Sequence, residues 1–497
     1  MNESTQRRTG LTRQMGLLGL AATGICSMMG ASINIVPFML QRNVPEIGPN
    51  VVYAYLFAII PAVLAALPYA ILASAMPRAG GSYVYASRAL NPYLGFVASF
   101  SQWFGLSIAI GVVSYVIVPF VRDIFDALGW TGVVAFLEIP NIRLLLALAF
   151  LWVFVWVNLR GLRLYERTLI PLMVLMFITG FVLIIAGFYF NQQDFIAATA
   201  QKTGQIIPPA EPFSFNFGAF LAASAILFSS FIGFDSIAQA GGEAKNPGRT
   251  LPLAIGVAIL TVGLFDLLFT GAVYHAVPWQ YISQEAQLRD LTAPGLLGVL
   301  LPVGWTVLIV SGAAIALIND LPAMLLSVSR LMFAWAEDGI FPKSVAKVHP
   351  KFHTPQLAIV LSACMASVGI LGSHFAGDFF LGVDILVTSM LVNFLLMSVS
   401  ILFLHRKNPT IASGITVLKS RKIQIPLGIL GVLTLGGFLG VHIWKDINAE
   451  VSAWYFHSTP VWLAVMAIAS IIYFREMRKL KASGADVDKI FGNLPPE

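Results

Sequence analysis

The stretch ATGICSMMGASINIVP, residues 22–37, places small, polar and glycine residues in the middle of an apolar segment. Pro37 has no backbone N–H and cannot donate to a helical hydrogen bond. One interpretation is a continuous helix whose small residues allow close helix crossings. The alternative, which we favour, is an unwound stretch around Gly30–Ser32 with a new half-helix beginning near Ile33. Amides at the start of such a half-helix are unpaired and partly positive, which suits a carboxylate.

The chain around this stretch is too apolar for a soluble protein. Of its 497 residues, 58% are hydrophobic and 11% are charged, whereas soluble domains carry about 25% charged residues. A hydrocarbon core of about 30 Å requires about 20 apolar residues per helix. The segments that meet this requirement are residues 15–40, 51–76, 92–121, 142–159, 167–190, 214–241, 250–275, 298–335, 356–373, 380–404, 425–445 and 459–475. The sequence therefore predicts an all-α integral membrane protein with about twelve transmembrane helices.

Lysine and arginine are distributed unevenly between the two sides that these spans define. The side that carries both termini holds 24 of the 30 basic residues. Because cytoplasmic loops are enriched in Lys and Arg, both termini are predicted to be cytoplasmic in a multi-pass protein of the cell (cytoplasmic) membrane. The net charge of +6 is then a result of topology, and we expect no nucleic-acid partner. Cys26 and Cys364 lie in apolar segments, where buried thiols are expected rather than a disulfide.

A second interruption lies in FSSFIGFDSI, residues 228–237, where Gly233 sits in an aromatic run next to Asp235. An unwound segment here would present carbonyl oxygens that can hold an ammonium group. Non-helical backbone at this depth is tolerated only where it lines a cavity. Two broken helices, five spans apart, are typical of a transporter built from inverted repeats with its site at the bilayer midplane.

Four stretches resemble the amino acid–polyamine–organocation (APC) family of permeases, which share the leucine-transporter fold. Met29-Gly30-Ala31-Ser32-Ile33 and Pro37 stand where the family has G-S-G-I-F and a proline. The other stretches are PRAGGSYVY (residues 77–85) with Arg88, FIGFD (231–235) with GEAKNPGR (242–249), and SRLMFAWAEDGIFP (329–342) followed by Val348-His349 and Thr354-Pro355. Together they cover most of the first nine predicted helices.

The resemblance implies a leucine-transporter-like 5+5 inverted repeat in which helices 1 and 6 are discontinuous. The predicted parts are a cytoplasmic N-terminus at residues 1–14, a first repeat at 15–190, a second repeat at 214–404, peripheral helices within 405–475 and a cytoplasmic tail at 476–497. We expect the end of that tail, residues 479–497, to be mobile.

The resemblance also implies a substrate with both a carboxylate and an ammonium group. The predicted carboxylate site includes Gly30, and the carboxylate would meet the backbone amides of Ala31, Ser32 and Ile33. The ammonium would meet carbonyls of Met28, Ser229 and Ile232. Phe231 and Phe234 flank the second break and would either shape the pocket or pack in the core. Three residues depart from the family pattern: Ser32 replaces its second glycine, Asn34 replaces an aromatic, and Ser229 stands where some relatives place an aromatic gate.

Four acids, Asp235, Asp266, Asp320 and Asp384, lie within spans, where a charge is costly and usually functional. Asp235 would either titrate or cap the second half-helix. For Asp266 we expect a structural hydrogen bond, and for Asp384 contact with water near its helix end.

Asp320 is the strongest candidate for ion coupling. Beside it, Pro322 leaves the carbonyl of Ile318 without a helical partner, and oxygen ligands of this kind suit a hard cation or a proton. The amide side chain of Asn319 lies in the same turn. The resemblance places this stretch near the first break and would add oxygens of Ala316, Cys26 and Met29. Some proton-coupled relatives have a lysine in the fifth helix, whose ammonium takes the place of sodium. This chain has Val174 near that position and no lysine in the stretch. We therefore predict that Asp320 binds sodium or carries a proton.

Arg78 and Arg330 lie on the predicted cytoplasmic side with Glu337-Asp338 and Glu243-Lys245. They would form an inner gate of ion pairs or remain ordinary solvated loop charges. We find no metal-ligand cluster, phosphate-binding glycine loop or nucleophile triad in the sequence, so we do not expect an enzyme.

These features predict secondary active transport of an amino acid by alternating access, with ion-coupled uptake. No cofactor is expected besides the coupling ion, a proton or Na+, and the partners are the small-molecule substrate and membrane lipids. The alternatives are an amino acid exchanger or polyamine antiporter without ion coupling and, from another class, a membrane receptor or an intramembrane enzyme. The sequence makes no prediction of the oligomeric state.

Overall fold

A computed structural model describes residues 10–207, 213–376, 379–451 and 453–495. These residues form helices and contain no strand; only isolated bridges join Met15 to Ala244 and Ala79 to Ala240. Eleven helices are long and apolar enough to cross a membrane, and the shorter apolar helix α1 (Leu17–Met28) begins the first predicted span. The prediction of an all-α membrane protein with about twelve spans is confirmed.

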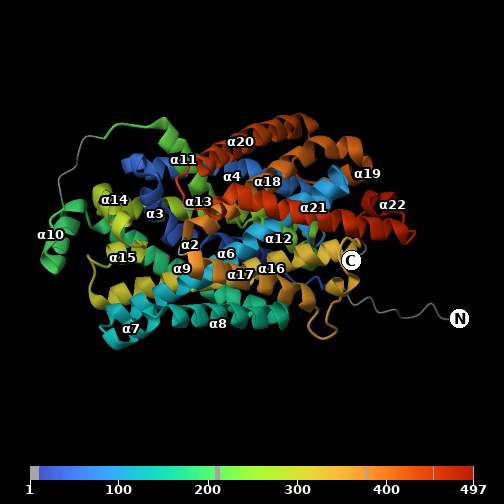
Figure 1. Ribbon diagram of the computed structural model, residues 1–497. Helices are drawn as coiled ribbons and strands as arrows, with labels where there is room; N and C mark the ends of the chain where they lie inside the picture. The colour runs from blue at the N-terminus through green and yellow to red at the C-terminus, as the bar shows by residue number, and fades with distance from the viewer. Residues whose placement is uncertain (1–9, 208–212, 377–378, 452, 496–497) are drawn as a thin grey trace.

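The long helices run roughly parallel to one another along the bundle (Figure 1). They are α4 (Val51–Ala75), α6 (Pro92–Ala127), α8 (Pro140–Leu159), α9 (Leu162–Tyr189), α13 (Pro247–Ala276), α16 (Val303–Glu337), α17 (Gln356–Ala376), α18 (Phe379–Lys407), α20 (Arg421–Ile447) and α21 (Ser458–Ala482). The sixth span is divided into α11 (Phe217–Leu227), the 3-10 turn η2 (Phe228–Phe231) and α12 (Asp235–Gln239).

Short helices cover the two ends of the bundle. One end, at the right of Figure 1, carries α19 (Pro409–Ala412) and α22 (Val487–Gly492). By their contacts with α22, α12 and α16, the same end carries α5 (Gly81–Ala89), η3 (Gly241–Glu243) and η4 (Lys343–Ala346). The other end carries α7 (Thr131–Glu138), α10 (Gln192–Thr203), α14 (Trp279–Leu288) and α15 (Ala293–Leu297). The turn η1 (Pro45–Asn50) contacts α14, and η5 (Trp454–Phe456) contacts α21. We call the first the basic end, because Arg78, Arg88 and Arg330 lie there, and the second the vestibule end.

Asparagine and proline residues define several helix starts. Asn91 caps α6 by accepting a hydrogen bond from the Leu94 amide (2.9 Å), and Pro92 follows it. Asn408 caps α19 in the same way, with a proline as the first helical residue. A side-chain acceptor satisfies an otherwise unpaired amide, and a proline has no amide to leave unpaired. Helix boundaries are thus set locally by the sequence.

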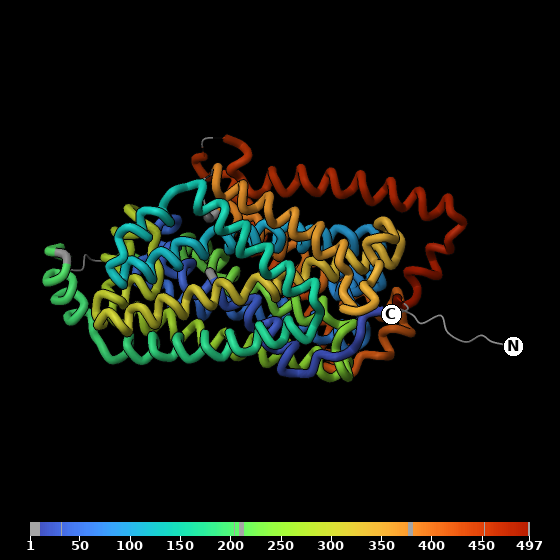
Figure 2. Tube along the Cα trace, turned by 90° about the horizontal axis from the view of Figure 1, so that it is seen from below, coloured from blue at the N-terminus to red at the C-terminus, as the bar shows by residue number. Residues whose placement is uncertain are grey.

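The interior of the bundle is formed by α1, α6, α11 with α12, α16 and α18. About 72% of the most apolar window of α6, α16 and α18 is buried, but only 28% of that of α20 and α21. Figure 2 shows α21, in red, along one edge of the bundle. These two helices are therefore peripheral, and any cavity near the bundle centre is built by the other spans.

Two sequence expectations are wrong. Cys364 is exposed on α17 rather than buried, because its face of the helix carries the exposed residues Leu361 and Val368; Cys26 is buried and no disulfide joins them. The end of the tail is folded as α22 as far as the described residues reach. Its apolar residues recur at helical spacing and pack against the bundle, which is why it does not extend into solvent.

Candidate substrate and ion site

The first span is broken between α1 and α2 (Ala31–Asn34). Met29 leaves the helix with φ −102° and ψ 63°. The break is therefore centred on Met29 and Gly30, slightly earlier than predicted, and the second half-helix begins at Ala31 rather than near Ile33. It continues, after an irregular residue, as α3 (Val36–Asn43).

Two polar side chains explain this earlier start. The Ser32 hydroxyl donates to the carbonyl of Met28, and the Asn34 amide donates to the carbonyl of Gly30 (3.1 Å). Both carbonyls lie at the break, so local side chains replace helical donors. Asn34, a departure from the family pattern, thus stabilises the break itself.

The second break lies directly against the first. Ile232 is extended (φ −77°, ψ 122°), Gly233 has φ 142°, and α12 starts at Asp235. A β-carbon at Gly233 would overlap the carbonyl of Ser27, so glycine is required for both backbone conformation and close approach. Asp235 accepts a hydrogen bond from the Gly233 amide (3.1 Å) and fixes the turn.

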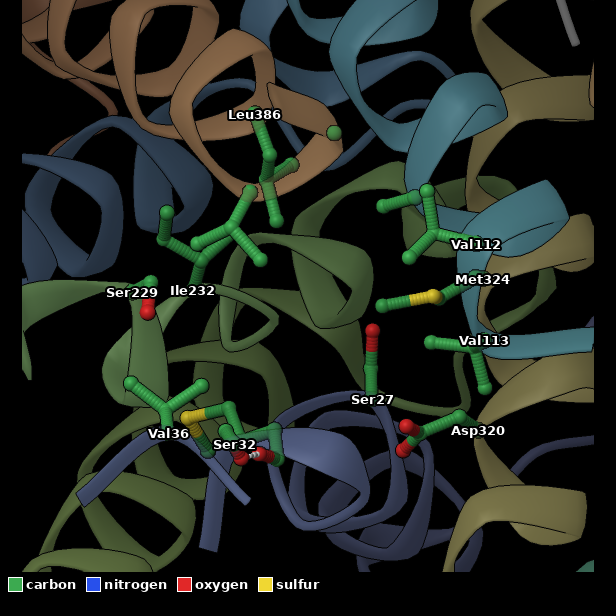
Figure 3. Close-up of a pocket in the computed structure, with 14 residues that line it drawn as sticks. Ser27, Ser32, Val36, Val112, Val113, Ser229, Ile232, Asp320, Met324 and Leu386 are labelled. Atoms are coloured by element: carbon green, nitrogen blue, oxygen red, sulfur yellow. Dashed lines mark hydrogen bonds between the residues drawn. The ribbon is translucent and has the colours of Figure 1, made fainter. Parts of the chain in front are cut away.

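A cavity of about 50 Å³ lies between the two breaks (Figure 3). By the usual criterion this volume is large enough to hold water. The polar residues of its lining are Ser27, Ser32, Ser229 and Asp320. Apolar residues lie among these polar ones: Met28, Val36, Ala109, Val112, Val113, Ile232, Met324, Gly382, Val383 and Leu386. One cavity therefore meets both interrupted helices, a carboxylate and an apolar surface.

Of the predicted substrate residues, Met28, Ser32, Ser229 and Ile232 line this cavity. Gly30 and Ile33 are not among its lining residues. Ala31 is described only by its backbone, which begins α2 next to the break. The apolar lining supplied by α6 and α18 was missed by sequence reasoning. Its valine and leucine residues have no sequence signal that distinguishes them from ordinary lipid-facing or core residues.

Phe231 and Phe234 pack around the second break without lining the cavity. Phe231 meets the ring of Tyr55 edge-on at 5.5 Å, and Phe234 stacks on Phe394 at 5.1 Å. Both rings are fully buried. Their contacts are those of core residues that support the unwound segment.

Asp320 and Asn319 point to different surroundings. Asp320 is 2% exposed and lines the cavity, and its carboxylate fills the space beside the α-carbon of Gly30. Asn319 instead donates to the carbonyl of Leu169 (3.1 Å) and to Cys26 Sγ (3.0 Å). Asn319 thus joins α16 to α9 and α1, while Asp320 faces the first break.

The remaining predicted ion ligands are dispersed. Ala316 and Met29 line a separate small cavity beside α9 and α13, and Cys26 contacts Asn319. Asp266 accepts a hydrogen bond from the Tyr55 hydroxyl (2.6 Å) and joins α13 to α4, and the side chain of Asp384 is 25% exposed. Only Asp320 among the four intramembrane acids lines the central cavity.

A larger cavity of about 990 Å³ opens at the vestibule end. Val112 lines both this cavity and the central one, so the two are adjacent. Charged side chains line the larger cavity in equal numbers: Arg42, Arg122, Arg143, Arg289, Asp123, Asp126, Glu138 and Asp290. We call it the vestibule.

The family of the chain follows from comparison with known proteins. The sequence profile of the Amino acid permease family matches residues 15–471. The chain belongs to the amino acid permease family. The members of this family are transporters, and the resemblance in the four sequence stretches is thereby confirmed.

Individual relatives of this permease differ in their named substrates. It is similar to Branched-chain amino acid permease BcaP of Bacillus subtilis (strain 168), with 26% identity over 96% of each chain. It is also similar to Cationic amino acid transporter 4, vacuolar, of Arabidopsis thaliana, with 26% identity over 80% of this chain and 64% of that protein. Cationic amino acid transporter 4 of Mus musculus is 27% identical over 74% of this chain and 57% of that protein. The permease thus spans less than two thirds of either cationic transporter.

Between the central cavity and the basic end, the permease contains a buried polar network. Gln102 of α6 donates to Asp235 and accepts from Ser82. Gln239 donates to Ser82 and to Gln102 (3.2 Å each), and Asn393 of α18 donates to Gln102 (3.3 Å). All these residues are fully buried. The second break is therefore linked through Asp235 to α5 at the basic end.

Two buried ion pairs close the basic end of the permease. Arg330 of α16 makes a two-pronged contact with Glu243 (2.5 and 3.1 Å), and Arg88 of α5 makes one with Asp338. Burial lowers the pKa of Arg88, but the Asp338 carboxylate and the Tyr83 hydroxyl together raise it by more, so the guanidinium stays charged. Bidentate geometry of this kind is the strongest form of such a pair.

Of the two predicted gate residues, Arg330 forms an ion pair and Arg78 hydrogen-bonds to a backbone carbonyl. Arg330 pairs with Glu243 and not with the Glu337-Asp338 pair, and Arg78 donates to the carbonyl of Pro495 (2.9 Å). Arg88 was quoted in the family resemblance but not assigned to the gate. Its position in the same stretch as Arg78 is the signal that points to it.

Proposed function

We propose that this permease carries a neutral aliphatic amino acid across the cell membrane by alternating access, with the cavity between the two helix breaks as its substrate site. The observation that carries the proposal is that a single cavity is lined from both breaks, Ser27 and Ser32 on one side and Ser229 and Ile232 on the other. Proteins tolerate unwound backbone at membrane depth where it lines such a cavity.

The backbone around the cavity suits a zwitterion. The first amides of α2 have no partner within that helix and are partly positive, which favours a carboxylate. The carbonyls of Met28, Ser229 and Ile232 would accept the ammonium. The Ser32 hydroxyl uses one lone pair of the Met28 carbonyl, and a carbonyl oxygen has a second.

The apolar residues of the lining favour an aliphatic side chain. They include Val112, Val113, Val383, Leu386 and Met324. Asp320 is the one charged residue in this lining, and we assign it to the coupling cation. A cationic side chain would then lose its hydration against hydrocarbon without a second counter-charge, at a cost of several kcal/mol. The cavity therefore matches the named substrate class of the Bacillus relative better than that of the cationic transporters.

Ion coupling and orientation complete the proposal. Asp320 lies at the first break within reach of the substrate cavity and would bind the coupling cation, sodium or a proton. By the distribution of basic residues, the basic end faces the cytoplasm. The structure then corresponds to a state closed toward the cytoplasm, with the vestibule on the opposite side.

A thermal-shift screen of the purified permease tests the substrate. A ligand that binds the folded state at 100 times its Kd stabilises it by about 2.7 kcal/mol. We expect leucine, isoleucine or valine to raise the melting temperature, and arginine, lysine and putrescine to leave it unchanged, with and without sodium. Stabilisation by the cationic compounds alone would contradict the proposal.

Uptake by proteoliposomes tests the mechanism. We expect saturable uptake of the stabilising amino acid that increases with an imposed sodium or proton gradient. Equal counterflow with no gradient effect would instead identify an exchanger. No saturable flux of any amino acid would exclude transport altogether.

A further inference from the structure

Residues 484–495 fold back onto the basic end after α21. Gly484, with φ 80°, turns the chain, and Asp486 caps α22 by accepting from the Lys489 amide (3.0 Å). The apolar face of this segment carries Val487, Ile490, Phe491 and Leu494, all packed against the core. Phe491 is 7% exposed. The segment is therefore held in place by burial as well as by hydrogen bonds.

Arg88 is the main attachment point for this segment. While its guanidinium pairs with Asp338, it also donates to the carbonyls of Asn493 (3.1 Å) and Ile490 (3.3 Å). The same group lies over the ring of Phe491 at 5.2 Å. The last turn of a helix has unpaired carbonyls and a partial negative charge, so a buried cation is its natural partner.

Two further hydrogen bonds tie the segment to other parts of the bundle. Arg78, which follows α4, donates to the carbonyl of Pro495 (2.9 Å). Asn408, which follows α18, donates to the carbonyl of Gly492 (2.9 Å). With the Arg88–Asp338 pair, the segment links the ends of α4, α5, α16 and α18. These helix ends all lie at the basic end of the bundle.

We propose that residues 484–495 are a latch that holds the basic end closed and thereby limits the rate at which the substrate cavity opens to that side. The proposal rests on the proposed function, since a transporter must open at both ends in turn. Opening the basic end separates helices that the latch joins, so every latch contact stabilises the closed state alone. A contact made only in the closed state shifts the equilibrium between closed and open states toward the closed one by the whole free energy of that contact.

Two latch variants and one control test this inference. The first ends the chain after Ser483, and the second is Phe491→Ala, which keeps the full chain and removes the buried anchor. The control is Lys489→Ala, because Lys489 lies on α22 but is exposed. Hydrogen–deuterium exchange of residues 78–90 and 235–243 reports opening of the basic end without any assay of transport.

We expect both latch variants to increase exchange in these segments and to raise the uptake rate in proteoliposomes about tenfold, which corresponds to about 1.4 kcal/mol. Lys489→Ala should match the unmodified chain in both measurements. Unchanged exchange protection in both latch variants, or a lower uptake rate with unchanged thermal stability, would overturn the latch. If no amino acid binds or is carried, the proposed function fails, while the exchange experiment still decides whether residues 484–495 hold the basic end closed.

Discussion

The carboxylate of Asp320 occupies the space that a β-carbon on Gly30 would fill. The first helix break and the intramembrane acid of α16 are therefore packed directly against each other. Because Asp320 also lines the central cavity, this contact joins the candidate ion site to the candidate substrate site.

Gly30→Ala should abolish amino acid binding while leaving the helices formed. The added methyl would overlap the Asp320 carboxylate and force either the break or α16 to move. Thermal shift with a saturating neutral amino acid measures the loss. Gly256→Ala is the matched control, because a β-carbon there meets nothing within 4 Å. This variant should retain binding, and its free energy of unfolding should rise by up to about 1 kcal/mol because alanine favours the helix more than glycine does. Normal binding by Gly30→Ala would show that this contact is not needed.

Asp320→Asn should remove the dependence of uptake on an ion gradient. The substitution keeps the shape of the side chain but removes the charge and the titratable proton, so neither sodium nor a proton would be held there. Uptake with and without sodium and pH gradients is the measurement. Asp384→Asn, which alters a partly exposed acid, is the control and should keep its gradient dependence. Full gradient dependence in Asp320→Asn would end the ion-coupling proposal.

Breaking the pair between Arg330 and Glu243 should destabilise the permease markedly. Glu243→Gln or Arg330→Gln alone leaves one buried charge without its partner, which costs about 3–5 kcal/mol. The double variant should recover part of this loss, and melting temperatures of all four forms give the coupling. The exposed pair of Lys479 and Glu476 offers a comparison, because such pairs contribute about 0–1 kcal/mol. Single variants as stable as the unmodified chain would show that the basic end is closed by other contacts.

Leu386→Ala should shift substrate preference toward larger side chains. The lost methyl groups enlarge the apolar part of the cavity, and each methylene in such a pocket changes discrimination by about 10–200-fold. Competition of phenylalanine against valine for uptake measures the shift. Leu433→Ala, on the exposed face of α20, should leave the ratio unchanged. An unaltered ratio in Leu386→Ala would place the substrate side chain elsewhere.

Much of this fold was predictable because membrane spans depend on hydrophobicity and length alone. The two breaks were also predictable, since Gly30, Gly233 and Pro37 disfavour a continuous helix. The exact start of α2 was not, because it depends on hydrogen bonds from Ser32 and Asn34 that only three-dimensional geometry reveals.

The site was predicted where a residue type is unusual in a membrane and missed where it is ordinary. Asp320 stands out in an apolar helix, so its position at the cavity could be expected. Val112 and Leu386 have no such contrast with their neighbours. The partner of Arg330 is separated from it by 87 positions in the chain, and neither charge patterning nor spacing selects Glu243 among the nearby acids.

Four arginines and four carboxylates line the vestibule, so their charges sum to zero when all are ionised. Long-range attraction of a charged solute, which weakens as ionic strength rises, needs a net charge on the protein surface. A dipolar solute with zero net charge should then enter at a rate that barely changes between dilute and concentrated salt, while anions and cations gain no local enrichment over it.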